Sequence, residues 1–507
     1  VLPVEDSLES IFGAIRDSAL IHQSGGGVGY DFSRLRPKGD VVASTGGVSS
    51  GPVSFMRVFD ASVDAIRQGG RRRGANMGVL RVDHPDIEEF VTAKRDPNAF
   101  RNFNLSVSCE DSFLAAVREG REIPLVNPRN GAVVAYRNAH ALFELIAECA
   151  WETGDPGMIF LDRIDRDNPT PALGRITATN PCGEVPLLPY EACVLGSVNL
   201  ARLVRDGSVD WTRLGELVEL GVRFLDDCID ASHFPLPQIT QAVHGNRKIG
   251  LGVMGFADAL IELGVPYDDP AALRWADEIM AFVAERATAA SRALAAERGP
   301  FPNFPRSRYA ESGAPPIRNA TRTAIAPTGT LSLIAGCSSG IEPLYALAYE
   351  RHVLEGRTLV EVHPALERLA RAEGVWTPGL RHRLLHRGRV RDDPDVPERL
   401  RRLFPTAHEV PPEWHIRVQA AFQAHVDNAV SKTVNLPATA SVADVRDAYL
   451  TAFDLGCKGI TVYREGSKGG QVLTRISESG SCPECGTHLE FAEGGSLCRA
   501  CGFTSSV

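Results

Sequence analysis

The chain has 507 residues, of which 44% are hydrophobic and 23% are charged, with 47 Gly and 33 Pro. This composition is typical of a globular protein with a sizeable core, and it excludes collagen, coiled-coil and low-complexity classes. The formal net charge is −9, from 54 basic and 63 acidic residues, so bulk electrostatics do not support a nucleic-acid-binding or membrane-surface protein.

No segment approaches the roughly 18 to 20 consecutive apolar residues needed to cross a bilayer. The first residues, VLPVED, have neither the basic nor the apolar region of a signal peptide. We therefore expect a cytoplasmic protein.

Short β-branched runs alternate with longer amphipathic stretches, which indicates an α/β architecture with parallel strands. Apolar residues at helical spacing predict long helices at 53–68, 139–153, 214–231, 271–298 and 442–455. Residues 375–413 are rich in Arg, Asp and Pro and predict a surface insertion with little core. We expect three parts: a catalytic unit over 1–465, a flexible Gly/Ser-rich linker over 466–481, and a cysteine module over 482–507.

The chain has eleven cysteines, an odd and clustered set that favours catalysis or metal binding over a disulfide framework. Two Cys-x-x-Cys pairs in the tail have the spacing of a zinc ribbon, with Cys482, Cys485, Cys498 and Cys501 as ligands of Zn²⁺. The same pairs also suit a redox tail that exchanges a disulfide. A nucleic-acid-binding ribbon is a third interpretation, although Arg499 is the only Lys or Arg from 482 onward.

A proline-rich segment around Cys182 carries the clearest chemical pattern. Pro181 and Gly183 exclude a helix, so we expect an extended loop or a finger. Residues two apart in an extended chain point to the same side, which would bring Asn180, Cys182 and Glu184 onto one face. An amide, a thiol and a carboxylate can hold a substrate hydroxyl, abstract a hydrogen and act as a general base. On spacing alone, a proline-rich loop with an incidental cysteine is an alternative.

Asn180-Pro-Cys-Gly-Glu184, followed by Cys193, resembles the finger loop of the ribonucleotide reductases. Further stretches resemble the adenosylcobalamin-dependent class of that family, in the same order along the chain: His22-Gln-Ser-Gly-Gly-Gly-Val-Gly29, Gln68-Gly-Gly-Arg-Arg-Arg-Gly-Ala-Asn-Met-Gly78, Asn246-Arg-Lys-Ile-Gly-Leu-Gly-Val-Met-Gly255, and Ala326-Pro-Thr-Gly-Thr330 with Ser338-Ser-Gly-Ile-Glu-Pro343. The resemblance covers nearly the whole chain. It implies a ten-stranded α/β barrel around a central finger loop, with the zinc-ribbon-like module appended.

The resemblance also implies a role for each residue of the loop. Cys182 would become a thiyl radical that takes the 3′ hydrogen of the ribose, Glu184 would accept the 3′-hydroxyl proton, and Asn180 would bind the substrate hydroxyls. Cys193 would be one of two thiols that reduce the 2′ position and end as a disulfide. We therefore expect reduction of ribonucleotides to 2′-deoxyribonucleotides for DNA synthesis, with diphosphates favoured over triphosphates and with thioredoxin or a similar dithiol as reductant.

Two other regions resemble nucleotide sites of the family. The loop that would hold the substrate phosphates comprises Thr328, Gly329, Thr330, Leu331 and Ser332, and its amides and hydroxyls suit a phosphate at a helix start. The effector site for a dNTP would comprise Asp6, Ser7, Gln68, Gly69, Gly70, Arg71, Arg72 and Arg73, with residues 38–50 as a partner loop. Because such sites lie at a dimer interface in related enzymes, we expect a homodimer. Without the resemblance, these segments are a plain strand-to-helix turn and a solvated basic turn.

The source of the radical is predicted from Lys458-Gly-Ile-Thr-Val-Tyr-Arg-Glu465. Oxygen-dependent relatives carry two adjacent tyrosines here, whereas this chain has the single Tyr463. The resemblance therefore favours adenosylcobalamin as the cofactor. An external radical-generating subunit is the alternative.

The family's partner of Cys193 lies on an early strand, and residues 1–7 resemble the segment that follows that partner. We therefore expect a chain that begins just after the partner thiol, binds its ligands and does not turn over alone. A nucleotide-binding protein without turnover and a zinc-ribbon adaptor that binds nucleic acid are the alternatives from other classes.

Overall fold

The computed structural model describes residues 1–42, 46–65, 67–68, 72–352 and 358–467, together with three short strands between 490 and 506. The chain divides into two compact units, Val1–Pro343 with His408–Gly469 and Leu344–Ala407 with Gly470–Val507. Each unit is described by itself.

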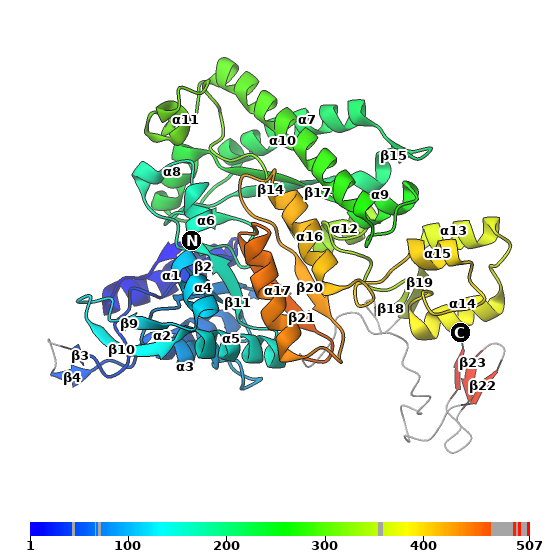
Figure 1. The fold of residues 1–507 in the computed structure, drawn as a ribbon. Helices are drawn as coiled ribbons and strands as arrows, with labels where there is room; N and C mark the ends of the chain where they lie inside the picture. The colour runs from blue at the N-terminus through cyan, green and yellow to red at the C-terminus, as the bar shows by residue number, and fades with distance from the viewer. Residues whose placement is uncertain are drawn as a thin grey trace. The chain divides into compact units, whose positions relative to one another are not determined.

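The large unit contains a seven-stranded sheet (Figure 1). Five of its strands come from the N-terminal part of the unit and two from the C-terminal part. The strands, in spatial order, are β1 (Leu2–Pro3), β2 (Val28–Asp31), β7 (Asn76–Arg81), β8 (Phe103–Cys109), β11 (Gly157–Phe160), β21 (Gly459–Arg464) and β20 (Thr433–Leu436). The first five are parallel to one another, β21 is antiparallel to β11, and β20 is parallel to β21. Parallel strands joined by helices confirm the α/β class.

An aromatic cluster fixes β2 in this sheet. Tyr30, Phe32, Phe59 and Phe103 are each at most 1% exposed. The ring of Phe59 meets those of Tyr30 and Phe32 edge-on, with centroids 4.8 and 5.3 Å apart, an arrangement that adds to the stabilisation from burial alone. The position of β2 matters because its backbone contacts the candidate site.

A second set of parallel strands comprises β14 (Val194–Asn199) and β17 (Ile249–Met254). Single parallel bridges extend it, from Leu251 to Thr323 and from Ile325 to Val430. Gly252 permits the close approach in the middle of this set, because a Cβ there would overlap the Ala324 carbonyl oxygen. A glycine inside a strand often marks such a backbone contact.

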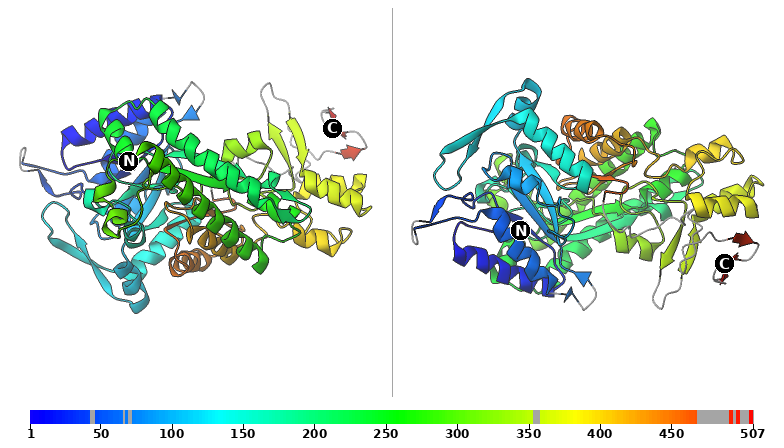
Figure 2. Two further views of the ribbon diagram at one scale, coloured as in Figure 1. Left: turned by 90° about the horizontal axis from the view of Figure 1, so that it is seen from above. Right: turned by 90° about the horizontal axis from the view of Figure 1, so that it is seen from below.

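Most of the helices of the large unit cover these two strand sets. In Figure 2, α7 and α10 run side by side, and they pack against each other. The helices are α1 (Leu8–Gln23), α2 (Pro52–Asp64), α3 (Ile87–Val91), α4 (Asp111–Glu119), α5 (Ala139–Thr153), α6 (Leu161–Arg166), α7 (Trp211–Ala231), α8 (Pro237–Asn246), α9 (Phe256–Glu262), α10 (Pro270–Arg298), α11 (Arg308–Glu311), α12 (Gly329–Ala335), α16 (Pro412–Gln423) and α17 (Val442–Asp454), with 3₁₀ turns at Pro171–Leu173, Leu200–Arg202 and Phe304–Arg306. Within the described ranges, no helix combines the length and apolar character needed to cross a membrane.

Short antiparallel pairs connect these elements. They are β3 (Val41–Val42) with β4 (Gly47–Val48), β5 (Arg67–Gln68) with β6 (Arg72–Arg73), β9 (Glu122–Val126) with β10 (Val133–Asn138), β12 (Ala178–Thr179) with β13 (Pro186–Leu187), and β15 (Val204–Arg205) with β16 (Ser208–Val209).

The five predicted long helices are all present, and four of them match within about three residues at each end. The exception is 53–68, where α2 ends at Asp64 because Arg67–Gln68 pairs with Arg72–Arg73 in a hairpin. The capping signals explain the accurate boundaries. Asp269 accepts a hydrogen bond from the Ala271 N–H at the start of α10, and a capping box begins α17.

The second unit has a core of its own, so the prediction of little core over 375–413 is wrong, although Leu344–Ala407 is an insertion between the two segments of the large unit. It contains β18 (Ala348–His352) paired with β19 (Thr358–Val362), and the helices α13 (Pro364–Ala372), α14 (Pro378–Arg387) and α15 (Glu398–Leu403). Leu384, Val396, Leu400 and Phe404 are each at most 2% exposed. The apolar residues are few but occur at helical spacing, and the many arginines between them concealed the pattern.

Candidate active site

The segment predicted to be an extended loop is the tip of a short hairpin. Its strands β12 and β13 pair antiparallel, and between them the Gly183 N–H donates to the Asn180 carbonyl at 3.1 Å. Gly183 has a φ of +83°, which glycine adopts without strain. The prediction of an extended chain is therefore wrong at this point. The turn gives Cys182 and Glu184 different surroundings instead of a common face.

Glu184 is nearly enclosed, with 2% of its surface exposed. Its Oε2 atom is buried without a hydrogen-bond partner among the described residues. Desolvation raises the pKa of Glu184, and a hydrogen bond from the Asn180 side chain opposes that shift. Asn180 is itself held by the Val185 N–H, which donates to its Oδ1 at 3.0 Å. A buried carboxylate with one unsatisfied oxygen gains from a hydroxyl donor and can take its proton.

Cys182, in contrast, is exposed and lines a cavity of about 250 Å³. Pro181 and Gly183 belong to the same wall. The lining also includes residues of β8, β11, β20 and β21, of the segments beside these strands, and of helix α16. Its apolar members include Leu105, Met158, Ile159 and Ile460, and its polar members include Ser106, Asp155, Gln419, Lys432, Thr433 and Thr461. The thiol is therefore accessible to a molecule in this cavity.

Cys193 immediately precedes β14 and is half-buried. Burial raises the pKa of its thiol, the positive charge of Lys248 opposes this, and the charge of Glu184 raises the pKa again. Cys193 and Glu184 thus lie close enough to influence each other electrostatically. The structure brings together three of the four predicted catalytic residues, Asn180, Glu184 and Cys193, while Cys182 faces the cavity at the tip of the same loop.

The glycine-rich stretch after α1 packs against the hairpin. A Cβ at Gly29 would overlap the Thr179 carbonyl oxygen, and one at Gly27 would lie 2.7 Å from Pro181 Cγ. Glycine is therefore required at both positions for the hairpin to approach β2 this closely. These contacts explain why the stretch from His22 to Gly29, one of the motifs behind the family resemblance, is rich in glycine.

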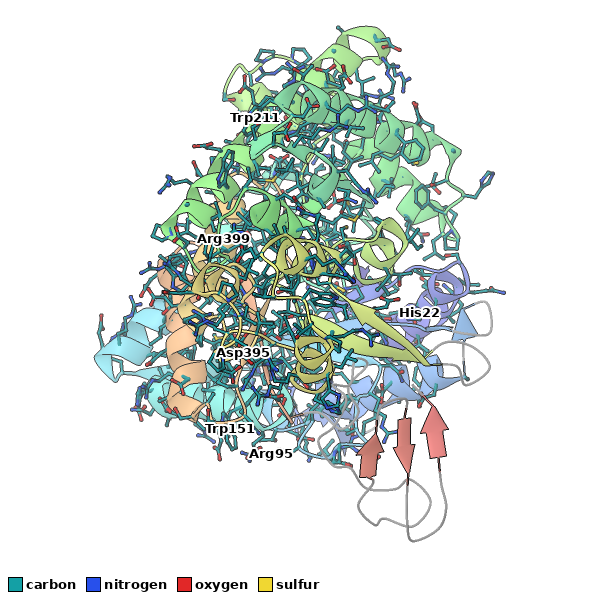
Figure 3. The ribbon with its side chains drawn as sticks, turned by 90° about the vertical axis from the view of Figure 1, so that its right-hand side faces the viewer. His22, Arg95, Trp151, Trp211, Asp395 and Arg399 are labelled. Atoms are coloured by element: carbon teal, nitrogen blue, oxygen red, sulfur yellow. The ribbon has the colours of Figure 1, made fainter. Side chains whose placement is uncertain are left out.

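His22, labelled in Figure 3, ties this stretch to β7. Its Nε2 lies 3.0 Å from Asn76 Oδ1, and its Nδ1 lies 2.9 Å from the Gly26 carbonyl oxygen. The ring is fully buried, and a Cβ at Gly74 would lie 2.8 Å from it. Two of the sequence motifs therefore meet at one histidine behind the hairpin.

A buried ion pair holds the chain between Cys182 and Cys193. Lys248 Nζ lies 2.6 Å from Glu191 Oε2, and the two side chains are 1% and 2% exposed. The same oxygen accepts a hydrogen bond from the Leu188 N–H at 2.7 Å. Because a desolvated pair is costly to break, it fixes this segment against β17.

The loop predicted to bind phosphate begins the short helix α12. Thr328 has a φ of +52°, and its Oγ1 accepts a hydrogen bond from the Gly340 N–H at 2.7 Å. Ser332 is buried, with its Oγ 2.9 Å from Ser339 Oγ. Gly329, Thr330 and Leu331 are exposed, and no side chain caps the helix. The binding of phosphate stays a prediction.

Some of the predicted effector residues have partners within the chain. Asp6 forms an ion pair with Arg36 at 2.7 Å, and Ser7 caps α1 by accepting a hydrogen bond from the Ser10 N–H at 3.2 Å. A serine before an apolar helical run is an N-cap signal, so the structural role of Ser7 is readable from the sequence. Gln68, Arg72 and Arg73 belong to the hairpin of β5 and β6, whereas Gly69, Gly70 and Arg71 lie outside the described residues.

The predicted zinc ligands Cys482, Cys485, Cys498 and Cys501 lie outside the described residues, as does most of the predicted linker. Near them, β22 (Glu490–Ala492), β23 (Gly495–Leu497) and β24 (Thr504–Ser506) form an antiparallel sheet. Zinc binding and redox exchange by the tail both stay predictions.

Two lysines beside the cavity, Lys432 and Lys458, were not predicted from the sequence. Lys432 donates to His415 Nδ1 at 2.8 Å and also contacts Glu342, and Lys458 donates to the Asn428 carbonyl at 2.7 Å. Burial lowers the pKa of both lysines. The chain has only six lysines among 54 basic residues. A lysine presents a compact ammonium group, whereas arginine presents a broad planar fork.

Comparisons with known proteins agree on one family. The family model described as "Ribonucleotide reductase, barrel domain" matches residues 1–316 and 312–463. A vitamin B12-dependent ribonucleoside-diphosphate reductase of Mycobacterium tuberculosis (strain CDC 1551 / Oshkosh) is 54% identical over 504 residues, which cover 99% of this chain and 72% of that protein. A protein of the same name from Thermoplasma acidophilum is 50% identical over 486 residues, which cover 96% of this chain and 63% of that one.

A solved structure shows the same fold. The Actinobacillus ureae class Id ribonucleotide reductase alpha subunit aligns with a TM-score of 0.76, over 92% of this chain and 83% of that chain, at 23% identity.

Proposed function

The chain belongs to the ribonucleotide reductase family, and on that premise we propose that it reduces ribonucleoside diphosphates to 2′-deoxyribonucleotides with a thiyl radical and adenosylcobalamin. The observation that carries the proposal is the contrast within one hairpin. Cys182 opens onto a cavity, whereas Glu184 is buried and its Oε2 has no hydrogen-bond partner in the part of the chain that the structure describes. Relatives at 50 to 54% identity are named vitamin B12-dependent ribonucleoside-diphosphate reductases.

The residues of the hairpin suit successive steps. The Cys182 radical takes the 3′ hydrogen of the ribose as S–H forms, and Glu184 takes the 3′-hydroxyl proton. Replacement of the 2′ hydroxyl by hydrogen, with release of water, then requires two electrons and two protons, which Cys193 and a second thiol supply as they form a disulfide. Glu184 returns its proton to the 3′ oxygen. Cys182 finally returns its hydrogen to C3′. Burial raises the pKa of Glu184, and a more basic carboxylate removes the 3′-hydroxyl proton more readily.

The cavity beside Cys182 fits part of the cofactor. Pockets for drug-sized ligands are usually about 300 Å³ or more, so a cavity of about 250 Å³ suits a nucleoside rather than a corrin. Leu105, Met158 and Ile460 offer apolar surface for a base, and Asp155 and Thr433 lie among the polar groups of the walls. When bound, adenosylcobalamin supplies a radical by homolysis of its cobalt–carbon bond. The residues that line the cavity, Cys182 among them, would hold the adenosyl group next to the thiol.

The strand pairing supports a ten-stranded barrel. One set of five parallel strands comprises β1, β2, β7, β8 and β11. A second set comprises β14, β17, the segments at 323–325 and 430–436, and β21, and the two sets meet antiparallel between β11 and β21. The hairpin of Cys182 would then lie inside the barrel.

The remaining binding sites are proposed from the resemblance and the local geometry. Residues 328–332 would bind the substrate phosphates through the exposed amides that begin α12. A dNTP effector would bind near Asp6, Ser7 and the hairpin of β5 and β6 in a homodimer. Thioredoxin or a similar dithiol would reduce the disulfide, and the tail cysteines would bind Zn²⁺ or take part in that exchange.

Anaerobic EPR tests the proposal. The purified chain is mixed with adenosylcobalamin, a ribonucleoside diphosphate and a dNTP. We expect a radical signal that Cys182→Ser abolishes and Cys228→Ser, a change at a half-buried cysteine on α7, leaves in place. A cofactor that binds without producing a signal in the unaltered chain would contradict the radical role of Cys182. Absence of cofactor binding would contradict the assignment of adenosylcobalamin and return the radical source to a separate subunit.

A further inference from the structure

Helix α16 presents three buried polar side chains one turn apart. His415, Gln419 and Gln423 are 0%, 1% and 7% exposed. Residues four apart lie on one face of a helix, so the three form a row. His415 contacts Lys432, whereas both glutamines have a buried amide oxygen without a hydrogen-bond partner among the described residues.

Only one of these two glutamines lines the cavity beside Cys182, and it is Gln419. Its Nε2 donates to the Gly459 carbonyl at 2.9 Å. The opposite assignment of the amide would place two oxygens against each other, so this hydrogen bond fixes the orientation of the group. Oε1 is then the atom left as an acceptor.

A buried acceptor without a donor is destabilising unless a ligand or water supplies one. The position of Gln419 in the cavity wall makes a ligand the relevant partner. An oxygen acceptor selects a group that carries N–H or O–H. A nucleoside offers both kinds of donor, an exocyclic amino group on the base and hydroxyls on the ribose.

We propose that Gln419 is a binding residue for the adenosyl group of the cofactor, accepting a hydrogen bond from the nucleoside through Oε1. This inference rests on the proposed function, which places adenosylcobalamin against Cys182. The ribonucleotide substrate also contains a nucleoside, so the experiment has to separate the two sources.

Equilibrium binding to the full chain makes that separation. The ligands are adenosylcobalamin, methylcobalamin, which has the same corrin but no nucleoside on its upper face, and a ribonucleoside diphosphate with a dNTP. We expect Gln419→Leu to weaken adenosylcobalamin binding about five- to tenfold, the usual effect of losing one hydrogen bond. Binding of methylcobalamin and of the ribonucleotide should not change.

Gln423→Leu is the matched control, because Gln423 has the same helix, residue type and unpartnered oxygen but does not line the cavity. It should leave all three affinities unchanged. Gln419→Met is a second variant that keeps the length of the side chain, and thermal unfolding shows whether each variant is folded.

A cofactor analogue tests the hydrogen bond without any substitution. A cobalamin that carries a carbocyclic spacer with neither amino nor hydroxyl groups in place of adenosine should bind the unaltered chain more weakly than adenosylcobalamin does. In Gln419→Leu the affinities for adenosylcobalamin and for the analogue should lie closer together, because the acceptor that distinguishes the two ligands is gone.

Several results would overturn the inference. An equal loss of affinity for both cobalamins in Gln419→Leu would indicate a structural role. A loss of affinity for the ribonucleotide alone would assign the cavity to the substrate. Unchanged affinity for all three ligands would also contradict the inference. If the unaltered chain binds neither cobalamin, the cofactor assignment itself fails. If it binds adenosylcobalamin and Gln419→Leu binds it equally well, only the role of Gln419 fails.

Discussion

The two sides of one hairpin differ in what they contribute. The Cys182 side is exposed toward a cavity, whereas the Glu184 side is buried with Cys193 and the Lys248–Glu191 ion pair nearby. A radical site has to be reached by a cofactor, so it cannot be packed into the core. A base gains strength from desolvation, and that desolvation requires a packed surrounding. We therefore expect substitutions on the exposed side to change chemistry alone, and substitutions on the buried side to change stability as well.

The largest effect that tests this difference is expected for Glu184→Gln. Removal of a general base should slow exchange of the ribose 3′ hydrogen by about 10²- to 10⁴-fold. Exchange measured with isotopically labelled substrate reports this step directly. A rate within threefold of the unaltered chain would contradict the role of Glu184.

The same variant should be more stable than the unaltered chain, and the gain should depend on pH. Burial raises the pKa of Glu184 above its ordinary value of 4.5, so the folded chain holds the proton more tightly than the unfolded chain. Stability from this group is therefore complete below pH 4.5 and declines as the pH rises through the raised pKa. Urea unfolding should show a gain of about 1 kcal/mol or more for Glu184→Gln at neutral pH. A gain that does not change with pH would point to another cause.

Lys248→Met tests the support of the buried side. Removing one partner leaves Glu191 as an uncompensated buried charge, so we expect a loss of about 3 to 5 kcal/mol in the free energy of unfolding. Lys38→Met is the control, because Lys38 pairs with Glu89 on the surface, where a pair contributes about 0 to 1 kcal/mol. Urea unfolding of both variants gives the comparison. If both variants lose the same free energy of unfolding, burial does not make the Lys248–Glu191 pair more important for stability than the Lys38–Glu89 pair.

Gly29→Ala tests the contact between β2 and the hairpin. The added Cβ would overlap the Thr179 carbonyl oxygen, and overpacking of this kind costs about 1 to 3 kcal/mol. Because the hairpin has to move, the rate of 3′ hydrogen exchange should fall as well. Gly13→Ala within α1 meets nothing within 4 Å and should stabilise the chain by up to about 1 kcal/mol. Thermal unfolding of both variants checks the prediction.

The features predicted well from the sequence are those that local chemistry determines. Asp269 and Pro270 begin α10, and Ser441 begins α17, so the helix boundaries follow from capping. The glycines of the family motifs were found by resemblance, and the structure adds their reason, since Gly29 and Gly252 each lie where a side chain would meet a neighbouring backbone.

The features that were missed depend on contacts between distant residues. Gln419 lies on a helix and faces a cavity whose thiol comes from position 182, and no local pattern connects the two. Lys432 is paired with Glu342, about ninety residues earlier. The turn at Gly183 was missed for another reason, because Asn-Pro-Cys-Gly is compatible with both a turn and an extended chain. Only the pairing of the flanking strands decides between them.

The smallest change in stability is expected for Cys182→Ser, on the exposed side of the hairpin. Cys182→Ser replaces an exposed thiol with a hydroxyl of similar size, so the free energy of unfolding should stay within about 0.5 kcal/mol of that of the unaltered chain, although the radical signal should disappear. Cys109→Ser is the matched control. Burial raises the pKa of the Cys109 thiol, and a hydroxyl in that apolar place should cost about 1 to 3 kcal/mol without affecting the radical. If Cys182→Ser destabilises the chain as much as Cys109→Ser does, the tip of the hairpin is part of the packed structure, and the separation of chemistry from stability does not hold.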